Sequence, residues 1–310
     1  MKKFVFASMT LMYGAALSLS AAEVTYDVVK AMEDAGNAKI IITFKDKTNR
    51  SKLKRRSSLK EVNRQLKANF KAASREVIDV LETQGKIGSG QVTGQFWAAN
   101  AVSATVDKKM LSRLSGRDDI AQITLDRVIM FEEPPQVQST TKDDENWTYG
   151  LKKMGVPEVR QSYNLTGEGI TVAVLDTGID AEHPDLAGKV VAWKDWAGES
   201  EEPKDAHGHG THCAGTIAGG STSGRAIGVA PDAKLVIGRI FGDNGSATLS
   251  GILGAMNWVT DPDGDAETND APQLVSNSWG GRQGSMEQEK SMWNIVKTWR
   301  SLNIVPVFAA

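Results

Sequence analysis

The chain has 310 residues, of which 40% are hydrophobic and 24% are charged. This length suggests two domains, and this composition excludes collagen-like, low-complexity and wholly disordered proteins. With Cys213 as its single cysteine, the chain cannot form an internal disulfide or a four-cysteine metal site. Basic residues exceed acidic ones by 21 to 18 over residues 23–146, whereas acidic residues lead by 20 to 13 over 147–310. We therefore expect no nucleic-acid partner for the acidic C-terminal part.

The segment 1–22 has the pattern of a secretory signal peptide. Lys2 and Lys3 precede an apolar run from Phe4 to Leu19, and Ser20-Ala21-Ala22 supplies the small residues that signal peptidase accepts. The apolar run contains polar residues and is shorter than a membrane span, which favours a cleaved signal over an anchor. We expect a secreted protein, extracellular or periplasmic, without stable membrane insertion.

Residues 23–131 predict a small α+β domain without catalytic residues, since they contain no histidine and no cysteine. Short β-rich runs alternate with a long and a short amphipathic helix, and two β-α-β halves of this size indicate a ferredoxin-like sandwich. The expected elements are strands at 40–44, 92–96, 101–106 and 120–125 and helices at 62–80 and 108–114.

The polar residues 132–146, which begin Glu132-Glu133-Pro134-Pro135, predict an exposed linker that contains a processing site. After this linker, over 147–310, short apolar strands alternate with helices. This alternation predicts an α/β domain with a parallel sheet and functional groups at the carboxyl ends of its strands. The expected strands are 172–175, 235–240, 274–276 and 304–308, and the expected helices begin near His209, Thr248 and Ser285.

Asp176 stands where the first of these buried strands turns into a loop, in the run Thr171 to Gly178. Such a carboxylate is a catalytic candidate, although a cap of a turn or helix is the structural alternative. The Asp-Thr-Gly triplet also occurs in aspartic proteases, but these need a second copy to share a proton between two carboxylates. The sequence contains no second copy.

Three of the four histidines, His207, His209 and His212, lie within six positions of one another. With a nearby carboxylate they could serve as zinc ligands. The glycines between them favour another interpretation, in which a histidine at the start of a helix is an exposed general base.

Four motifs occur in order: VAVLDTGID followed by AEHPDL, then HGHGTHCAGT, IGVAPDAKL and SNSWGG. Together they resemble the subtilisin-like serine proteases (subtilases), whose Asp, His, Ser chain order is a known family pattern. The resemblance implies an inhibitory prodomain over residues 38–131, which we extend to 23–131, and part of a subtilisin-like catalytic domain over 147–310. Asp176 matches the triad aspartate and His209 the triad histidine, while His207 and His212 become structural or supporting residues.

The resemblance also implies where other ligands bind. Peptide or protein substrates would lie between two backbone edges, Gly245-Ser246-Ala247 and Ser278-Trp279-Gly280, and the prodomain would be an intramolecular partner. Asp185 matches a family calcium ligand, so structural calcium is a possible cofactor, with a capped turn as the alternative; no organic cofactor is implied. Cys213 resembles the free cysteine of the proteinase K branch, or is simply a small buried hydrophobe.

The nucleophilic serine that the resemblance requires is not found in this sequence. None of the serines that follow Cys213 stands in the Gly-Thr-Ser-Met-Ala-like context of the catalytic serine, and no oxyanion asparagine follows Ala309-Ala310. We expect a secreted serine endopeptidase zymogen of which this chain is an incomplete, inactive part. The alternative is a non-catalytic protein, a prodomain or pseudoprotease, that binds other proteases. The serines in question are Ser221, Ser223, Ser246, Ser250, Ser276, Ser278, Ser285, Ser291 and Ser301.

Overall fold

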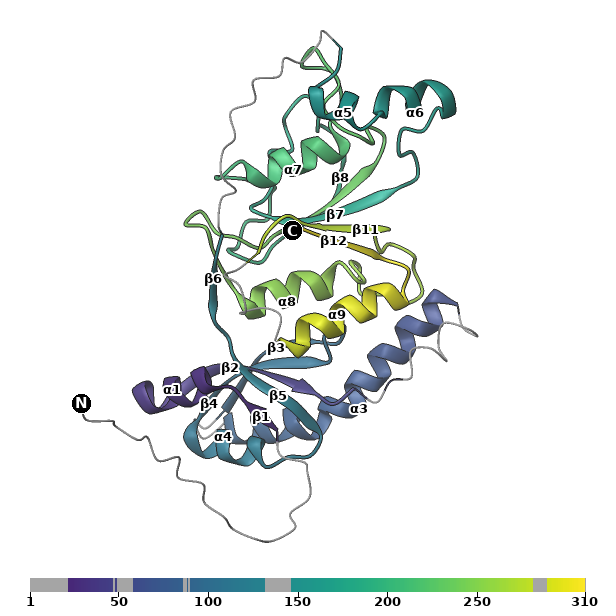
Figure 1. Ribbon diagram of the computed structural model, residues 1–310. Helices are drawn as coiled ribbons and strands as arrows, with labels where there is room; N and C mark the ends of the chain where they lie inside the picture. The colour runs from purple at the N-terminus through teal and green to yellow at the C-terminus, as the bar shows by residue number, and fades with distance from the viewer. Residues whose placement is uncertain are drawn as a thin grey trace, which may run out of the picture.

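The computed structural model describes residues 22–46, 48, 58–85, 88, 90–131, 146–280 and 289–309. The predicted linker, apart from Asn146, and the predicted signal segment, apart from Ala22, lie outside these residues. Two domains, 22–131 and 146–309, stack end to end, and each contains its own five-stranded sheet (Figure 1). No helix among the described residues is long and apolar enough to cross a bilayer.

The N-terminal domain (22–131) has the sheet order β1-β5-β2-β4-β3, in which β2 pairs antiparallel with both β4 and β5, and β3 with β4. Without the short parallel edge strand β1, this is the strand order of a ferredoxin-like sandwich. Its elements are β1 (Glu23–Val24), α1 (Tyr26–Ala35), β2 (Asn37–Phe44), α3 (Leu59–Gly85), β3 (Gly90–Phe96), β4 (Ala101–Asp107), α4 (Lys108–Ser115) and β5 (Ile120–Leu125).

Helix α3 forms because apolar residues recur at helical spacing through a run of charged ones. Its buried residues Val62, Leu66, Phe70, Val77 and Leu81 pack against the sheet. The following short helix, α4, begins with a side-chain cap: the Asp107 carboxylate accepts a hydrogen bond from the Met110 N–H at 2.7 Å.

The C-terminal domain (146–309) has the sheet order β12-β11-β7-β9-β8, and every neighbouring pair is parallel. Its elements are α5 (Tyr149–Lys153), α6 (Val156–Tyr163), β7 (Thr171–Asp176), β8 (Val190–Asp195), α7 (His209–Ala218), β9 (Lys234–Arg239), β10 (Ser246–Thr248), α8 (Leu249–Trp258), β11 (Leu274–Asn277), α9 (Lys290–Ser301) and β12 (Val305–Phe308). The mainly parallel α/β fold predicted from the sequence is confirmed, whereas β8 and the short α5 and α6 were not expected.

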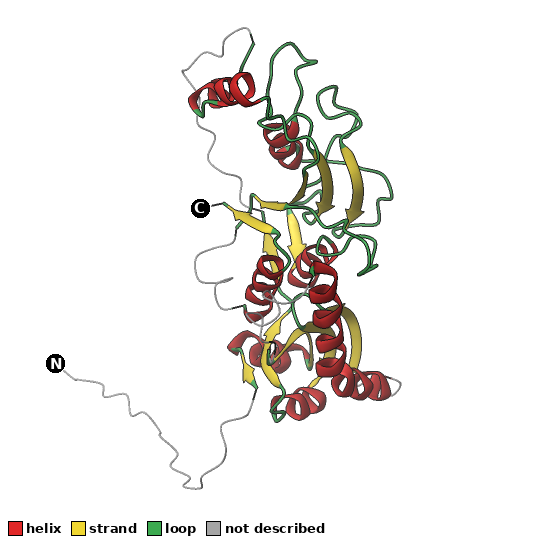
Figure 2. Cartoon of the chain, turned by 90° about the vertical axis from the view of Figure 1, so that its right-hand side faces the viewer, coloured by secondary structure: helices red, strands yellow, loops and turns green. Residues whose placement is uncertain are grey.

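Strand β7 shows why the parallel strands are apolar on both faces. Ala173 and Leu175 belong to the core that α8 and α9 cover, and Val172 and Val174 belong to the core that α7 covers. Helices therefore lie on both faces of this sheet (Figure 2). Strand β7, which carries Asp176, is buried on both faces as a result.

Helices α8 and α9 also cover the N-terminal sheet, so they lie between the two sheets (Figure 1). The side chain of Asn257 accepts a hydrogen bond from the Ala98 N–H at 2.9 Å. Asn294 donates to the Ala99 carbonyl at 3.0 Å, and Thr298 donates to the Ala98 carbonyl at 2.9 Å. The backbone of the β3–β4 connection is thus satisfied by side chains of the other domain.

Charged groups join the domains beside this contact. The Arg127 guanidinium lies 2.7 Å from a Glu289 carboxylate oxygen, and Thr124 donates to the other oxygen at 3.0 Å. Asp126 accepts hydrogen bonds from the N–H and hydroxyl of Ser250 at 2.8 and 2.7 Å, in the first turn of α8. An acidic side chain from one domain therefore stabilises the start of a helix in the other.

Candidate active site

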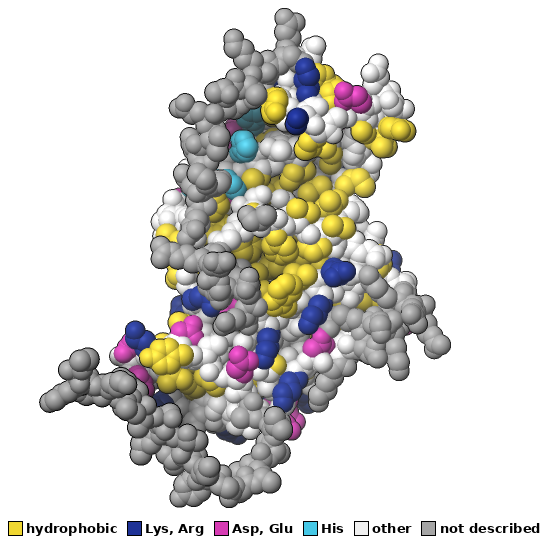
Figure 3. All heavy atoms as spheres, viewed as in Figure 1, with side chains coloured by type: hydrophobic (Ala, Val, Ile, Leu, Met, Phe, Trp, Pro, Cys, Tyr) yellow, Lys and Arg dark blue, Asp and Glu magenta, His cyan; other side chains and the backbone are white. Residues whose placement is uncertain are grey.

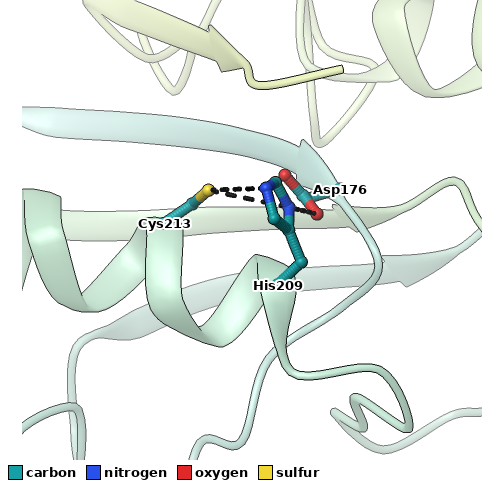
Figure 4. A group of neighbouring side chains, drawn as sticks. All are labelled: Asp176, His209 and Cys213. Atoms are coloured by element: carbon teal, nitrogen blue, oxygen red, sulfur yellow. Dashed lines mark hydrogen bonds and ion pairs between the residues drawn. The ribbon is translucent and has the colours of Figure 1, made fainter. Parts of the chain in front are cut away.

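The site is built on the carboxyl end of β7 and the first turn of α7, and its main feature is a carboxylate–imidazole pair (Figure 4). A carboxylate oxygen of Asp176 lies 2.7 Å from Nδ1 of His209, and the same oxygen accepts the Thr177 N–H at 2.8 Å. The Asp176 side chain is 1% exposed, and that of His209 is 17% exposed. A hydrogen bond to the carboxylate places the imidazole proton on Nδ1, which leaves Nε2 as the proton acceptor.

Two glycines let the helix approach the strand closely enough for this contact. A Cβ at Gly210 would lie 2.2 Å from the Gly178 carbonyl oxygen, and a Cβ at Gly178 would lie 1.9 Å from the Lys204 carbonyl oxygen. Gly178 also has a φ of +122°, which only glycine adopts readily. Gly210 therefore lets α7 pack closely on the end of β7, and Gly178 lets the loop before α7 do the same.

Asp205 holds the loop before α7, a role that the sequence reasoning did not assign. Its carboxylate accepts hydrogen bonds from the His207 and Gly208 N–H groups at 3.0 and 2.8 Å and from the Thr211 hydroxyl at 2.6 Å. The Thr177 hydroxyl also donates to it at 3.0 Å. Burial opposes ionisation, but these hydrogen bonds outweigh it and hold the pKa of Asp205 below its ordinary value. The signal available in the sequence was an aspartate four residues before the candidate base.

Cys213 lies one helical turn after His209, with its sulfur 3.8 Å from both ring nitrogens (Figure 4). Burial, and then the nearby Asp176 carboxylate, raise the pKa of the thiol to about 11. Such a thiol is protonated at neutral pH and is therefore a poor nucleophile. The residue packs in the core that α7 covers.

The other histidines occupy different positions around α7. The His207 ring lies beside His209, with 6.5 Å between the ring centroids, while His212 is exposed. Among the described residues, the compact group of possible metal ligands that includes a histidine is Asp176, His209 and Cys213. The structure therefore does not gather His207, His209 and His212 into the zinc site considered from the sequence.

One of the two predicted substrate edges pairs with a strand of this chain. Strand β6 (Val128–Met130), which the sequence did not predict, runs antiparallel to β10, so that Ile129 faces Ala247 and Met130 faces Ser246. The Phe131 N–H then donates to the Gly245 carbonyl at 2.7 Å. An extended segment of the N-terminal domain thus adds a strand to the edge Gly245-Ser246-Ala247.

The second predicted edge, Ser278-Trp279-Gly280, follows β11. Trp279 is 5% exposed and packs against Phe241 with 6.1 Å between the ring centroids, and Gly280 is exposed. The Ser278 hydroxyl is close enough to Cys213 to lower the thiol pKa in part. This segment therefore lies on the Cys213 side of the site, and its contact with a substrate strand stays a prediction.

Asp185 lies apart from the pair, and its surroundings decide whether calcium fits. Its carboxylate accepts hydrogen bonds from the Thr222 N–H at 2.6 Å and from the N–H and hydroxyl of Ser223. Burial opposes ionisation, but these donors hold the pKa of Asp185 below its ordinary value. Calcium needs six to eight oxygen ligands, whereas this loop points N–H and O–H donors at the carboxylate. The residues around Asp185 do not fit a calcium ion, and Asp185 acts as an anchor for the loop.

Known proteins match this chain over the part that carries the site. Residues 167–310 match the family model described as Peptidase_S8: Subtilase family. The serine protease AprX of Bacillus subtilis is 39% identical over 156 residues, which are 49% of this chain and 35% of that protein. Subtilisin E of the same organism is 32% identical over 208 residues, 67% of this chain and 48% of that protein.

A solved structure agrees at the level of the fold. The chain superposes on fervidolysin from Fervidobacterium pennivorans, described as a keratinolytic enzyme related to subtilisin, with a TM-score of 0.54. The identity is 20%, and the match covers 94% of this chain and 42% of the other. The chain spans half or less of the length of these proteins. Residues 167–310 belong to the subtilase family, and the chain is subtilisin-like, as its motifs predict.

Proposed function

We propose that the chain is part of a secreted serine endopeptidase zymogen, in which Asp176 and His209 are the orienting acid and the general base. The observation that carries this proposal is the 2.7 Å hydrogen bond between a buried carboxylate and Nδ1 of an accessible imidazole. Proposed secretion rests on the signal-like segment 1–22.

In the proposed reaction a serine hydroxyl attacks the carbonyl carbon of a peptide bond, and its proton passes to Nε2 of His209. Asp176 holds the ring and stabilises the imidazolium. His209 then gives this proton to the leaving amine as the C–N bond breaks. Water repeats the sequence on the acyl-enzyme, which releases the acid and restores the serine. Since no serine after Cys213 has the expected context, we propose that the 310-residue chain alone has no peptidase activity.

We further propose that residues 23–131 are an inhibitory prodomain. Support comes from β6, which occupies the edge that a substrate strand would need, and from Phe131, whose ring lies 4.7 Å from the His209 ring. A segment so placed excludes substrate until it is removed. The residues between 131 and 146 are the proposed region of processing.

The proposed peptidase activity is tested with the protein expressed from its intact gene. The assay measures its hydrolysis of casein and of chromogenic peptides. His209→Ala and Asp176→Asn should each lower kcat by at least about 10³-fold, because the base or its orientation is lost. His212→Ala is the matched control on the same helix and should stay within about twofold. Equal activity in all three variants would contradict the assigned roles.

The same preparation separates this proposal from the non-catalytic alternative. Intact protein that hydrolyses nothing, yet inhibits an added subtilisin-like protease at micromolar concentration, would favour a protease-binding function. The predicted result is hydrolysis together with inhibition of the mature enzyme by residues 23–131.

A further inference from the structure

Arg239, the last residue of β9, has a buried guanidinium that lies between two carboxylates. Its Nη1 donates to the two carboxylate oxygens of Asp195 at 3.0 and 2.8 Å, and its Nη2 donates to Asp243 at 2.5 Å. The side chains of Arg239 and Asp195 are 4% and 2% exposed, whereas that of Asp243 is 58% exposed. Because a guanidinium presents its donors in a rigid fork, one arginine can hold two carboxylates in fixed positions. We call these three residues the Arg239 clamp.

The Asp195 end of the clamp is fixed at the end of β8. Besides the guanidinium, its carboxylate accepts hydrogen bonds from the backbone N–H groups of the loop that follows. The donors are Ala197, Gly198 and Ser200, at 3.0, 2.9 and 3.2 Å. Movement of this end would break several hydrogen bonds of a buried carboxylate at once, so it is the rigid end of the clamp.

The Asp243 end lies in the turn that leads into β10. The Gly242 N–H donates to the Ser246 carbonyl at 2.9 Å, and the Gly245 N–H donates to the Gly242 carbonyl at 2.9 Å. Lys204 donates to the outer side of the Asp243 carboxylate at 3.1 Å. The turn is closed by its own hydrogen bonds, and Asp243 is the side chain through which the clamp holds it. The clamp therefore holds the edge with which β6 pairs.

The sheet connects the clamp to the candidate catalytic pair. Arg239 stands opposite Asp176 in the parallel pairing of β9 with β7, and the Asp176 carbonyl accepts the Ile240 N–H at 2.8 Å. The backbone that carries the guanidinium is thus bonded to the backbone that carries the orienting carboxylate. A shift of Asp243 relative to Arg239 would therefore change where the β10 edge lies relative to Asp176 and His209.

Stability alone does not account for this arrangement. The Nε–H of Arg239 is buried and has no hydrogen-bond partner among the described residues, which opposes folding. Its bond to Asp243 has one exposed partner, and ion pairs of that kind contribute little to stability. The same bond nevertheless fixes the direction in which the turn lies, which points to a role in geometry.

We propose that Arg239 is a positioning residue, which acts through Asp243 to hold the β10 edge where an extended peptide can pair with it and reach His209. Arg239 itself touches no substrate. It should therefore affect the binding of peptides long enough to pair with β10, and not the chemical step at His209. This inference rests on the proposed peptidase function.

The first test uses two substrates of the protein expressed from its intact gene. One is an extended hexapeptide that can pair with β10, and the other is a chromogenic ester of a single amino acid, too short to reach it. Asp243→Ala should raise KM for the hexapeptide at least about fivefold with little change in kcat, because binding common to substrate and transition state is lost. Neither parameter should change for the ester. An equal loss of kcat with both substrates would show a merely structural role and overturn the proposal.

A second variant addresses the guanidinium itself. Arg239→Lys keeps a positive charge beside Asp195 but lacks the fork that reaches Asp243, so it should reproduce the change in KM. The double variant with Asp243→Ala should show little further change, whereas additive effects would contradict the clamp. Arg160→Met is the matched control, since Arg160 lies in the same domain and donates to the Val229 carbonyl at 3.2 Å. It should leave KM for the hexapeptide unchanged.

The second test needs no catalysis and uses the 310-residue chain, in which β6 occupies the β10 edge. Amide hydrogen exchange over 128–131 and 245–247 should be at least about tenfold faster in Asp243→Ala and in Arg239→Lys, as expected when local pairing loosens. Exchange over the same residues should be unchanged in Arg160→Met.

The two tests separate the clamp from the peptidase function. Unchanged exchange in Asp243→Ala would overturn the clamp, whatever the hydrolysis shows. Faster exchange, together with no hydrolysis of either substrate by the parent protein, would contradict the proposed peptidase and support the clamp as the device that holds the edge for β6. Hydrolysis with the same KM in the parent and in Asp243→Ala would overturn the positioning role and leave the peptidase function standing.

Discussion

The two domains cover their sheets in different ways. The C-terminal sheet has its own helices on both faces, α7 on one and α8 with α9 on the other. The N-terminal sheet has its own helices on the face that bears Ile40 and Ile42, but Ile41 on the other face packs into the core of α8 and α9. The N-terminal domain therefore completes its core only by binding its neighbour.

The candidate catalytic pair lies in one domain, and the other domain only contacts it and the helices behind it. The C-terminal domain contains the Asp176–His209 pair. The N-terminal domain contributes an acceptor to the first turn of α8, two carbonyls to α9, and strand β6, which alone among these lies beside the pair. Figure 3 shows hydrophobic side chains gathered midway along the molecule on one face. On α9 and β12 the exposed large apolar residues are Trp293, Val305, Val307 and Phe308.

The largest expected effect on the free energy of unfolding comes from a substitution within the C-terminal domain. Gly210→Ala places a methyl group against the Gly178 carbonyl and should lower the free energy of unfolding by about 3 kcal/mol or more, since backbone cannot yield as a side chain can. Urea unfolding followed by tryptophan fluorescence measures it. Gly150→Ala is the control and should change little, because an added Cβ there would meet no atom within 4 Å apart from its chain neighbours and the backbone of its own helix.

Loss of the Glu289 carboxylate should weaken the contact between the domains. Glu289→Ala leaves Arg127, which is 22% exposed, without this partner, and should cost about 2 kcal/mol, below the cost for a fully buried pair. A double-mutant cycle with Arg127→Ala, read from urea midpoints, measures the coupling. Strictly additive effects would show that the two charges do not interact.

Asp205 should make the C-terminal domain sensitive to acid. The pKa of Asp205 is lower in the folded protein than in the unfolded chain, where it is near 3.8. Its contribution to the free energy of unfolding is therefore fully present above the pKa of the unfolded chain, and it is lost as the pH falls through the pKa of the folded protein. Asp205→Asn should therefore melt at a lower temperature at pH 7 and approach the parent protein at pH 3. A difference that grows towards pH 3 would reverse the assigned sign.

The Asp126 carboxylate, which caps α8 from the other domain, should contribute less to the free energy of unfolding. Asp126→Ala removes the acceptor for the Ser250 N–H and hydroxyl, and should cost about 1 kcal/mol, as loss of an N-terminal helix cap does. Faster hydrogen exchange confined to the first turn of α8 would locate the effect. Asp118→Ala, at an exposed position of the same domain, should have no such effect.

The smallest expected effect is that of calcium removal. Thr222 and Ser223 already donate hydrogen bonds to the Asp185 carboxylate. EGTA should therefore leave the contribution of this site to the melting temperature unchanged, whereas Asp185→Asn should lower the melting temperature. The comparison is made by calorimetry with and without added calcium. A melting temperature that rises with calcium in the parent protein but not in Asp185→Asn would contradict this prediction.

Much of the fold could be predicted because burial leaves a local signal. The continuous apolar run of β7 indicated a strand covered on both faces, and the helical spacing in α3 indicated one apolar face. The strands β6 and β10 escaped prediction because each has three residues and is stabilised by its pairing partner. The helix expected near Ser285 begins at Lys290 in the described residues.

For the site, the sequence by itself determined which chemical groups are present: Asp176 at a strand end and His209 at a helix start. Only the tertiary structure decided that Asp205 anchors the loop before α7, that Asp185 accepts hydrogen bonds from Thr222 and Ser223, and that the Phe131 ring lies against the His209 ring. The physical reason is the distance along the chain over which each interaction acts. Periodicity and turn chemistry act between residues close in the chain, whereas Phe131 meets Phe241 only because strands from the two domains pair with each other.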